Sequence, residues 1–543
     1  MKKVVGIFVS KNRCIAHNGD RYLTCEKDIL DFLLKRQNDI NCFYNLSYNV
    51  ACLLSWLELS EEQLTKLKED KDIFYKDYKL SYITNKFFAI KKGTGWDSPY
   101  VQFCDISQYI PWKLEDNNTV EYDVGKAREA QKTGQEVYNG LVKLGLNPDK
   151  GMTSPIRVYE KDKLRNMDLP TLADIPEEAS QYAYEACKAG WFEVYNKGHY
   201  DHVWDYDLSS AYGRGVFDLM DIRLGKFWKS EQYEPNADYG YIRGEITINS
   251  EFSPFVFSVD NGEDVELYSL IGTWDYILRK SCVDGQWENI PYIISKKQYD
   301  MLYKWKIGSF KIYDAWWWQS QGKKYPYRDA VNWLYEQKEK GVGLEREIPK
   351  RQIVGLFGLQ LQTMMDGFGD YFNPIYGCEI EMNTRMEVFD ACMSNNVIPL
   401  SIALDGILVD KPLNLRMNEG MGSWKLSHEG KAIVVSTVAV AVEGKEAEQD
   451  FAVNYNWLLD QIKQNPTERV YSKDKISHIS LEKAIKDHKL GNIGEVEKIS
   501  RSIDVAYETK RLYFDRPMTG QELLDNKYES SPLDISFMCI DKQ

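Results

Sequence analysis

Short apolar runs that end at small or turn-forming residues recur along the chain, and one of them ends on an acidic residue. Val203, Trp204 and Tyr206 predict a buried strand that ends on Asp207. The chain then turns into an amphipathic segment through a set of small residues, Ser209, Ser210, Ala211 and Gly213. A carboxylate at a strand end, followed by the free N–H groups of a tight turn, is suited to bind Mg²⁺ and phosphate oxygens. The ordinary alternative is an aspartate that caps the following helix.

A second acidic residue lies between two apolar runs in the stretch 397–412. These runs flank Asp405-Gly406, a dipeptide that is the strongest short-range signal for a β-hairpin. Most such turns are exposed to solvent, but apolar flanks on both faces predict a buried hairpin. A buried carboxylate requires a partner or a metal ion. Asp207 and Asp405 therefore predict a pair of metal ligands of the kind that phosphoryl-transfer sites use.

A helix between these two elements carries a basic residue and an aromatic residue on one face. Its start is predicted around Pro349, because proline is favoured in the first helical turn. Lys350, Val354, Phe357 and Gly358 follow at spacings that place them on a single face. A cation above an aromatic ring and a glycine suits a helix that holds a triphosphate and lets a base lie flat. An ordinary amphipathic helix would show the same pattern.

The remaining pattern indicates a mixed α/β protein. Residues 1–190 combine short apolar strands with helical spacings, and prolines between residues 147 and 176 indicate a connection between domains. Residues 239–248 and 309–318 predict strands rich in tyrosine and tryptophan. With 543 residues the chain is too long for a single core, so we expect about two to four domains.

Composition and charge exclude several classes of protein. The net charge of −14 argues against a protein coated in nucleic acid but allows a local basic channel. The 10 cysteines form no CxxC pair and the 6 histidines do not cluster with them, so we expect a reduced, intracellular protein without a zinc site. No apolar stretch reaches membrane-spanning length, so we expect no membrane partner and a cytoplasmic location.

The three elements, taken in this order, resemble motifs A, B and C of the family B DNA polymerases, and most closely the compact protein-primed polymerases of small bacteriophages. DLSSAYG at 207–213 is similar to the family's DxxSLYP. KRQIVGLFG at 350–358 is similar to KxxxNSxYG, and ALDGI at 403–407 is similar to DTDSI. The stretches 190–198 and 296–318 also resemble the region before motif A and the insertion that docks a terminal protein.

The resemblance implies a site for metal ions and a nucleotide. Asp207 and Asp405 would hold two Mg²⁺ ions, with Mn²⁺ as an alternative, aided by the backbone carbonyl of Leu208. Leu208, Ser210 and Tyr212 would contact the nucleotide, and the Tyr212 ring would stack under the sugar and reject a 2′-hydroxyl.

Motif B implies the remaining nucleotide contacts. Lys350 would contact the triphosphate, with Arg346 and Lys338 as helpers. Phe357 and Gly358 would shape the floor under the nascent base pair.

The resemblance also implies a fold class and a set of partners. The class is a multidomain α/β (α+β) protein, with an RNase H-like exonuclease-type domain followed by a right-hand polymerase of palm, fingers and thumb. The implied parts are an exonuclease-like domain at 1–190, palm with motif A at 191–225, a terminal-protein-region-like insertion at 226–325, fingers with motif B at 326–362, palm with motif C at 363–445 and a thumb or C-terminal region at 446–543. Expected partners are primer–template DNA, dNTPs and a terminal protein, in the bacterial host cytoplasm if a phage encodes the chain.

The N-terminal region resembles the family's 3′–5′ exonuclease domain with its acidic residues removed. The stretch 43–57 is similar to the second exonuclease motif, but Asn49 stands where the metal-binding aspartate belongs. Ile7 and Val9 stand where the first motif would have Asp and Glu, and Lys126 replaces the aspartate of the third. Because a two-metal nuclease requires those carboxylates, we expect a domain that is retained structurally and catalytically inactive.

The polymerase motifs also depart from the family pattern. The first aspartate of motif C is Ala403, and the Asn and Ser of motif B are Val354 and Gly355. A Lys-x-Tyr expected around residues 436–438 is absent, and the stretch between motifs B and C lacks the length of a second insertion.

The leading interpretation is a templated DNA polymerase that adds dNTPs to a primer 3′-hydroxyl by two-metal phosphoryl transfer in viral DNA replication, without proofreading. The eroded motifs favour a second interpretation, a catalytically impaired relative that acts as a scaffold for nucleic acid or protein. A third interpretation is a template-independent nucleotidyltransferase. The sequence leaves open whether the primer is protein, RNA or DNA.

Overall fold

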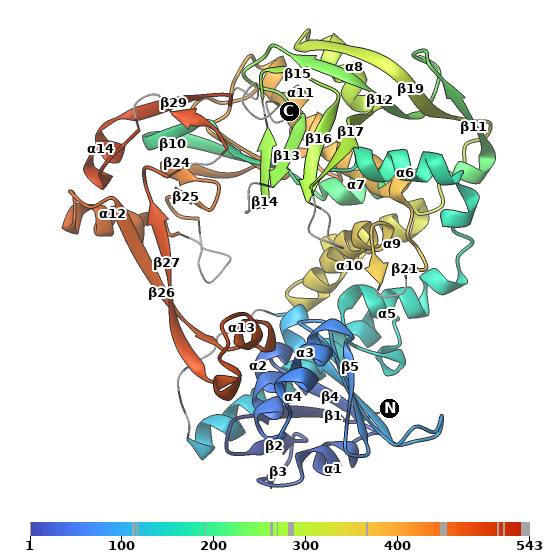
Figure 1. Ribbon diagram of the computed structural model, residues 1–543, viewed down its shortest axis with the longest axis vertical. Helices are drawn as coiled ribbons and strands as arrows, with labels where there is room; N and C mark the ends of the chain where they lie inside the picture. Colours follow the sequence, from blue (N-terminus) through green and yellow to red (C-terminus); the bar gives the residue numbers. More distant parts are fainter. Residues whose placement is uncertain are drawn as a thin grey trace. The chain divides into compact units, whose positions relative to one another are not determined.

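The chain forms two compact units, and each unit is assembled from stretches that lie far apart in the sequence (Figure 1). The computed structural model describes residues 2–110, 115, 117, 119–188, 190–260, 264–268, 270–280, 287–364, 367–445, 453–507, 510–513 and 516–533. The first unit comprises Met1–Met167, Leu334–Gly355 and Asp474–Ser500, and the second comprises Asp168–Trp333, Leu356–Lys473 and Arg501–Gln543. The finer division into palm, fingers and thumb stays a prediction.

The first unit is built on one mixed sheet of eight strands. The strand order is β3 (Tyr22–Cys25), β2 (Cys14–His17), β1 (Val4–Val9), β4 (Ile40–Phe43), β8 (Tyr100–Asp105), β7 (Phe87–Lys92), β6 (Tyr78–Ile83) and β5 (Asp72–Tyr75). β1 pairs with β4 in parallel and β4 pairs with β8 in parallel, whereas the other neighbours are antiparallel. The sheet is mixed, as the predicted RNase H-like domain requires.

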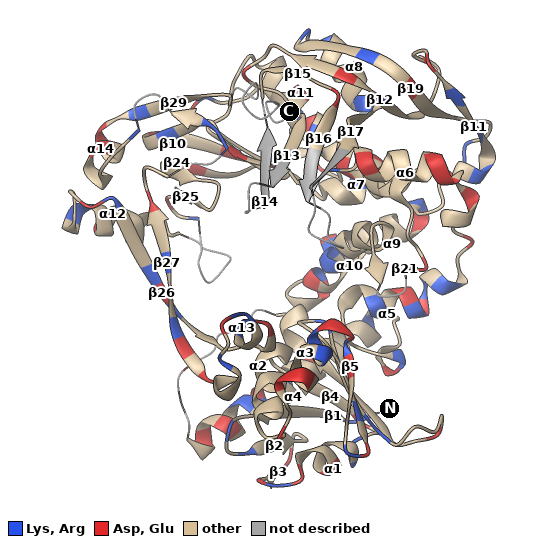
Figure 2. Cartoon of the chain, viewed as in Figure 1, with Lys and Arg blue, Asp and Glu red and all other residues tan. Residues whose placement is uncertain are grey.

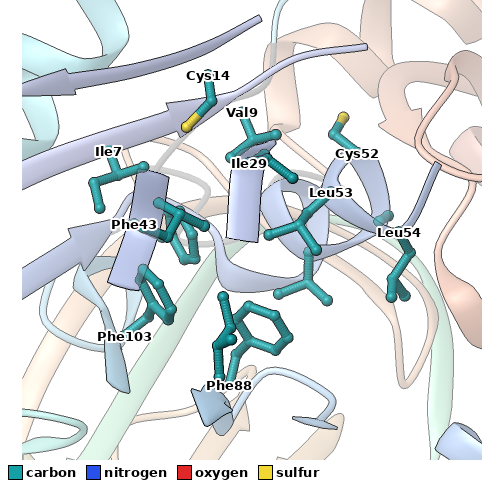
Figure 3. Packing of buried hydrophobic residues seen from close by; sticks show 14 of the residues in the cluster. Ile7, Val9, Cys14, Ile29, Phe43, Cys52, Leu53, Leu54, Phe88 and Phe103 are labelled. Atoms are coloured by element: carbon teal, nitrogen blue, oxygen red, sulfur yellow. The ribbon is translucent and has the colours of Figure 1, made fainter. Parts of the chain in front are cut away.

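Helices cover this sheet closely, and apolar side chains fill the interface. The helix α4 (Val120–Lys143) packs on β1 at Gly6, where an added Cβ would lie 2.1 Å from the carbonyl oxygen of Ala127. Between the sheet and α2 (Leu46–Ser55), the rings of Phe43 and Phe103 stack with centroids 4.7 Å apart (Figure 3). Other helices with residues in this unit are α1 (Ile29–Leu34), α3 (Glu61–Glu69), α5 (Pro155–Asp162), α9 (Arg328–Lys340), α10 (Leu344–Gln360) and α13 (Leu481–Lys486).

The second unit has an eight-stranded sheet in which the longest strands lie at the centre. Its main path is β25 (Ala439–Val442), β24 (Trp424–Ser436), β10 (Asn196–Leu208), β23 (Gly406–Val409), β22 (Ser401–Ala403) and β9 (Phe192–Val194), with β28 (Leu512–Tyr513) and β29 (Lys527–Ser531) attached through β10. The helices α12 (Tyr455–Gln464) and α14 (Gly520–Asp525) contact this sheet, whereas α7 (Ala211–Phe217) and α6 (Glu177–Ala186) pack on α11 (Pro374–Ser394). The predicted strand ending near Asp207 is confirmed as β10.

A second sheet in this unit contains the tyrosine- and tryptophan-rich strands. Its members are β11 (Gly225–Ser230), β19 (Gly308–Ser320), β12 (Tyr239–Ile248), β15 (Gly272–Trp274) and β18 (Ile293–Ser295). The strands predicted at 239–248 and 309–318 are confirmed as β12 and β19. The unit also contains the hairpins β13 (Val256–Asp260) with β14 (Asp264–Tyr268), β16 (Tyr276–Lys280) with β17 (Trp287–Pro291) and β20 (Thr363–Met364) with β21 (Gly367–Phe368). The helix α8 (Lys296–Lys304) packs on β12 and β19.

Charged residues of both signs occur together along the long hairpin formed by β26 (Val470–His478) and β27 (Val496–Asp504) (Figure 2). Arg469 pairs with Asp504 at 2.7 Å in the second unit, and Lys498 pairs with Asp474 at 2.6 Å in the first. Neighbouring acids therefore neutralise part of the basic C-terminal region. Among the helices that the structure describes, none is both long enough and apolar enough to cross a lipid bilayer.

Candidate active site

Two aspartates lie side by side at one end of the central strands of the second unit. Asp207 is the penultimate residue of β10, and its strand neighbour on β23 is Gly406. The backbone N–H of Leu208 donates to the carbonyl oxygen of Asp405 over 3.0 Å. These contacts join the ends of motif A and motif C directly, so the two sequence-predicted metal ligands meet at one place in the sheet.

The hairpin that carries Asp405 turns one residue earlier than its sequence suggested. Ala403 pairs with Gly406, so Leu404 and Asp405 form the two-residue turn and Gly406 begins β23. Leu404 has a φ of 59°, which a two-residue hairpin turn requires at its first central position. A leucine rarely adopts this conformation, and the N–H of Leu404 is held by the carbonyl oxygen of Trp191 at 2.8 Å. Such strain is typical of functional turns.

The charge of Asp207 affects the ionisation of Asp405. Burial, and after it the negative charge of Asp207, raise the pKa of Asp405 to about 6. The ammonium group of Lys425 opposes this effect, and its Nζ lies 2.8 Å from Oδ2 of Asp207. Two carboxylates that raise each other's free energy in this way form an arrangement that a divalent cation would stabilise. Among the described residues, no group of three or more acidic, histidine or cysteine side chains could hold a metal ion.

Tyr212 is the second residue of α7, which begins just after the turn that follows Asp207. Its ring stacks on the ring of Phe357 from α10, with centroids 4.7 Å apart and planes 3° from parallel. Burial raises the pKa of Tyr212 to about 12, with further contributions from the charges of Glu381 and Asp405. The two aromatic residues predicted in motifs A and B therefore form one surface beside the aspartates.

A cavity of about 480 Å³ adjoins this aromatic pair, with a lining that includes Tyr212, Phe357, Leu404, Glu381 and Cys187. Oε1 of Glu381 accepts a hydrogen bond from Arg385 at 2.5 Å, and Oε2 accepts one from the Cys187 thiol at 3.0 Å. Sequence reasoning missed Glu381, because α11 is buried around most of its circumference and shows no periodic polar face. It also missed Lys425, which only the register of β24 brings to Asp207.

The other predicted nucleotide-binding residues fall into two groups. Ser210 lies in the turn between β10 and α7 with a φ of 50°, and Gly358 lies next to Phe357 in the second unit. Lys338, Arg346 and Lys350 lie on the parts of α9 and α10 that belong to the first unit.

The predicted helix start at Pro349 is wrong. The helix α10 begins at Leu344, and Pro349 lies inside it. The proline has no N–H to donate to the carbonyl of Glu345, so the helix continues with one intrahelical bond missing. The preference of proline for the first helical turn is a local signal, and it misplaced the start of this helix.

The four positions predicted to have lost exonuclease carboxylates lie in the first unit. Ile7 and Val9 are fully buried in β1 and contribute apolar surface to the core (Figure 3). Asn49 accepts the Val9 N–H over 2.8 Å and donates to the carbonyls of Tyr44 and Asn45 over 3.1 and 2.8 Å. Three hydrogen bonds thus make Asn49 a structural clamp between α2 and β1.

The fourth position, Lys126, forms ion pairs with Glu129 at 3.2 Å and Glu115 at 3.7 Å. Sequence reasoning missed Asp123, a buried acid one turn earlier on α4. Its Oδ2 accepts hydrogen bonds from Ser10 at 2.9 Å and Arg13 at 3.1 Å, which offset part of the cost of burying this charge.

The chain was compared with protein-family models, curated sequences and solved structures, and the solved structures include proteins with a similar fold. No protein-family model matches the chain, and no curated protein sequence matches it. Among solved structures, Phi29 DNA polymerase in an orthorhombic crystal form is similar with a TM-score of 0.65 and 10% sequence identity, covering 93% of this chain and 100% of that chain. The chain has a fold similar to that of Phi29 DNA polymerase. This likeness confirms the predicted multidomain α/β class.

Two further structures of Phi29 DNA polymerase give the same picture. Its complex with primer–template DNA has a TM-score of 0.62, and its complex with primer–template DNA and incoming nucleotides has a TM-score of 0.60. Each is 11% identical to this chain, covers 93% of it and is itself covered completely.

The raised pKa of Asp405 predicts a pH-dependent stability difference. The folded protein binds the Asp405 proton more tightly than the unfolded chain, so ionisation destabilises the fold as the pH rises through about 6. Without divalent ions, we expect Asp405→Asn to be about 1–2 kcal/mol more stable than the unsubstituted protein at pH 8, and nearly equal to it at pH 4, by urea unfolding. Asp410→Asn, at an exposed position after β23, is the control. A stability difference for Asp405→Asn that does not change with pH would contradict the prediction.

The hydrogen bonds of Asn49 predict a structural role. Asn49→Ala leaves the buried Val9 N–H unsatisfied and should lower the free energy of unfolding by about 2–3 kcal/mol, measured by urea unfolding. Asn49→Asp should also destabilise, because a carboxylate would face the carbonyls of Tyr44 and Asn45. The exposed Asn139→Ala on α4 is the control. Unchanged stability of both Asn49 variants would show that the clamp contributes nothing.

Proposed function

We propose that this protein is a templated DNA polymerase that adds dNTPs to a primer 3′-hydroxyl by two-metal phosphoryl transfer. The observation that carries the proposal is the meeting of Asp207, on β10, with Asp405, in the turn just before β23, next to the stacked rings of Tyr212 and Phe357. The fold, similar to that of Phi29 DNA polymerase, supports the same reaction class. By analogy, the partners are primer–template DNA and dNTPs.

The proposed cofactor is Mg²⁺, with Mn²⁺ as an alternative. Asp207, Asp405 and the carbonyl of Leu208 supply oxygen donors, which both ions prefer. The residues fit such ions, because the Leu208 N–H to Asp405 carbonyl bond brings two carboxylates together and burial followed by the Asp207 charge raises the pKa of Asp405. When bound, the ions would activate the primer hydroxyl and stabilise the charge on the leaving pyrophosphate.

The roles of the nucleotide-binding residues are part of the proposal. The ring of Tyr212 would lie against the sugar and exclude a 2′-hydroxyl, and Phe357 would extend the same surface under the base pair. Lys350, Arg346 and Lys338 would contact the triphosphate, as the resemblance to motif B implies.

The proposal includes the absence of proofreading, with a role in protein-primed viral replication. Three observations support an inactive exonuclease-like domain: Ile7 and Val9 are core residues, Asn49 is fully engaged in hydrogen bonds, and Lys126 is a cation. The resemblance of the insertion after motif A to a region that docks a terminal protein supports a terminal protein as the primer.

One observation favours the rival proposal of a non-catalytic scaffold. Ala403 removes a carboxylate that the family has in motif C, and Lys425 neutralises part of the charge that remains. Tight binding of primer–template DNA without extension would support this rival.

The first test is extension of a labelled primer–template by the purified protein with Mg²⁺ or Mn²⁺ and dNTPs. We expect templated extension, a loss of at least about 10²-fold in Asp207→Ala and Asp405→Ala, and no shortening of the primer in any lane. Asp201→Ala, at an exposed position on β10, and Asp410→Ala are the matched controls, because both remove an aspartate near the same strands.

Extension without a template would identify the template-independent transferase. Extension that survives both aspartate substitutions would show that these residues do not hold the catalytic ions. Primer shortening by the purified protein would contradict the inactive exonuclease-like domain.

The stacked tyrosine predicts a second result. Tyr212→Val removes the ring and should lower the preference for dNTPs over rNTPs by about tenfold or more, measured as the ratio of kcat/KM values. Tyr212→Phe keeps the ring and should retain the preference. Equal discrimination by Tyr212→Val and the unsubstituted protein would assign the exclusion of ribose to another residue.

A further inference from the structure

The candidate active site contains a cation of its own. Lys425 is the second residue of β24, and its strand neighbour on β10 is Asp207. Side chains at directly opposed positions of an antiparallel pair lie on the same face of the sheet. The Lys425 ammonium uses this position to contact Oδ2 of Asp207 over 2.8 Å.

The backbone holds Lys425 at this position from both sides. Trp424 pairs with Leu208 and Leu426 pairs with Tyr206, so the register is continuous around the pair. Before the strand, the N–H of Gly422 donates to the carbonyl of Ser209 over 2.7 Å, and the N–H of Ser209 donates to the carbonyl of Ser423 over 2.9 Å. These bonds tie the start of β24 to the turn that follows Asp207.

The charge of Lys425 acts on both carboxylates. It contacts Asp207 directly, and its positive charge favours the ionised form of Asp405. Motif C has Ala403 at the position of a family carboxylate, so the described cluster consists of two acids and one base. Its formal charge is therefore smaller than that of the two aspartates alone.

We propose that Lys425 is an internal counter-ion of the catalytic aspartates, which a divalent cation must displace from Asp207. This inference rests on the proposed function, because it assumes that Asp207 binds a metal ion. A cation that coordinates Oδ2 of Asp207 competes with an ammonium group already bound to that atom. Lys425 thereby sets the concentration of Mg²⁺ or Mn²⁺ that the site requires.

A second ion pair on β10 provides a matched control. Lys445 contacts Oδ2 of Asp205 at 2.7 Å, and Asp205 lies two residues before Asp207. The two pairs have similar lengths and lie on the same strand. Only the Lys425 pair includes a proposed metal ligand, so the inference predicts an effect for Lys425 and none for Lys445.

The test is a titration of Mn²⁺ into the full-length protein, with free Mn²⁺ measured by electron paramagnetic resonance and no DNA or nucleotide present. We expect Lys425→Met to bind Mn²⁺ about two- to fivefold more tightly than the unsubstituted protein, since a partly exposed ion pair no longer competes. Lys425→Arg should keep the original affinity. Lys445→Met should leave it unchanged, and Asp207→Asn should weaken it strongly.

Unchanged or weaker Mn²⁺ binding by Lys425→Met would overturn the inference. Weaker binding of primer–template DNA by that variant, with unchanged Mn²⁺ binding, would assign Lys425 to a phosphate of the DNA and would likewise overturn it. Failure of the counter-ion inference is distinguishable from failure of the proposed polymerase. Primer extension by the unsubstituted protein tests the polymerase, whereas the Mn²⁺ titration requires no reaction.

Discussion

The antiparallel register of β10 with β23 on one side and β24 on the other determines which charged groups can meet in the candidate site. Through it, Asp207 has Gly406 as one neighbour and Lys425 as the other. A slip of one residue would move each side chain to the opposite face of the sheet. Buried residues such as Val203 and Ile407 make such a slip costly, so apolar packing along the strands fixes the position of the polar groups at their ends.

The Asp207–Asp405 pair and the Asn49 clamp are buried polar sites of opposite kinds. In the second unit, Asp207 and Asp405 keep carboxylates close together, at a cost that is visible in the raised pKa of Asp405. In the first unit, the Asn49 amide accepts one hydrogen bond and donates two, and Val9 is a buried apolar residue of the core. The first unit does keep one buried acid in this region, Asp123, whose pKa burial raises and whose Oδ2 accepts hydrogen bonds from Ser10 and Arg13. The contrast therefore concerns the Asp207–Asp405 pair and the Asn49 clamp, and not the two units as a whole.

Sequence patterns predicted the elements well where a local signal determines them. The apolar run before Asp207 predicted β10, and the runs around Asp405 predicted a hairpin. The hairpin turn was misplaced by one residue because the Asp-Gly signal is local, whereas a contact with Trp191 stabilises the unusual backbone of Leu404. Pro349 was mistaken for a helix start because the preference of proline for the first helical turn is likewise a local signal.

Residues that reach the site only through long-range pairing left no signal in the sequence. The length of the connection between Asp405 and Lys425 does not determine the register of β24 against β10. Glu381 lies on α11, a helix with no polar face. The loss of a carboxylate at Ala403 was visible from the motif, but its consequence was not. With Lys425 beside Asp207, the cluster attracts divalent cations less strongly than three carboxylates would. In the proposed polymerase an incoming triphosphate would bring negative charge of its own, so the site would depend more on its substrate to retain the ions than a site with three acids.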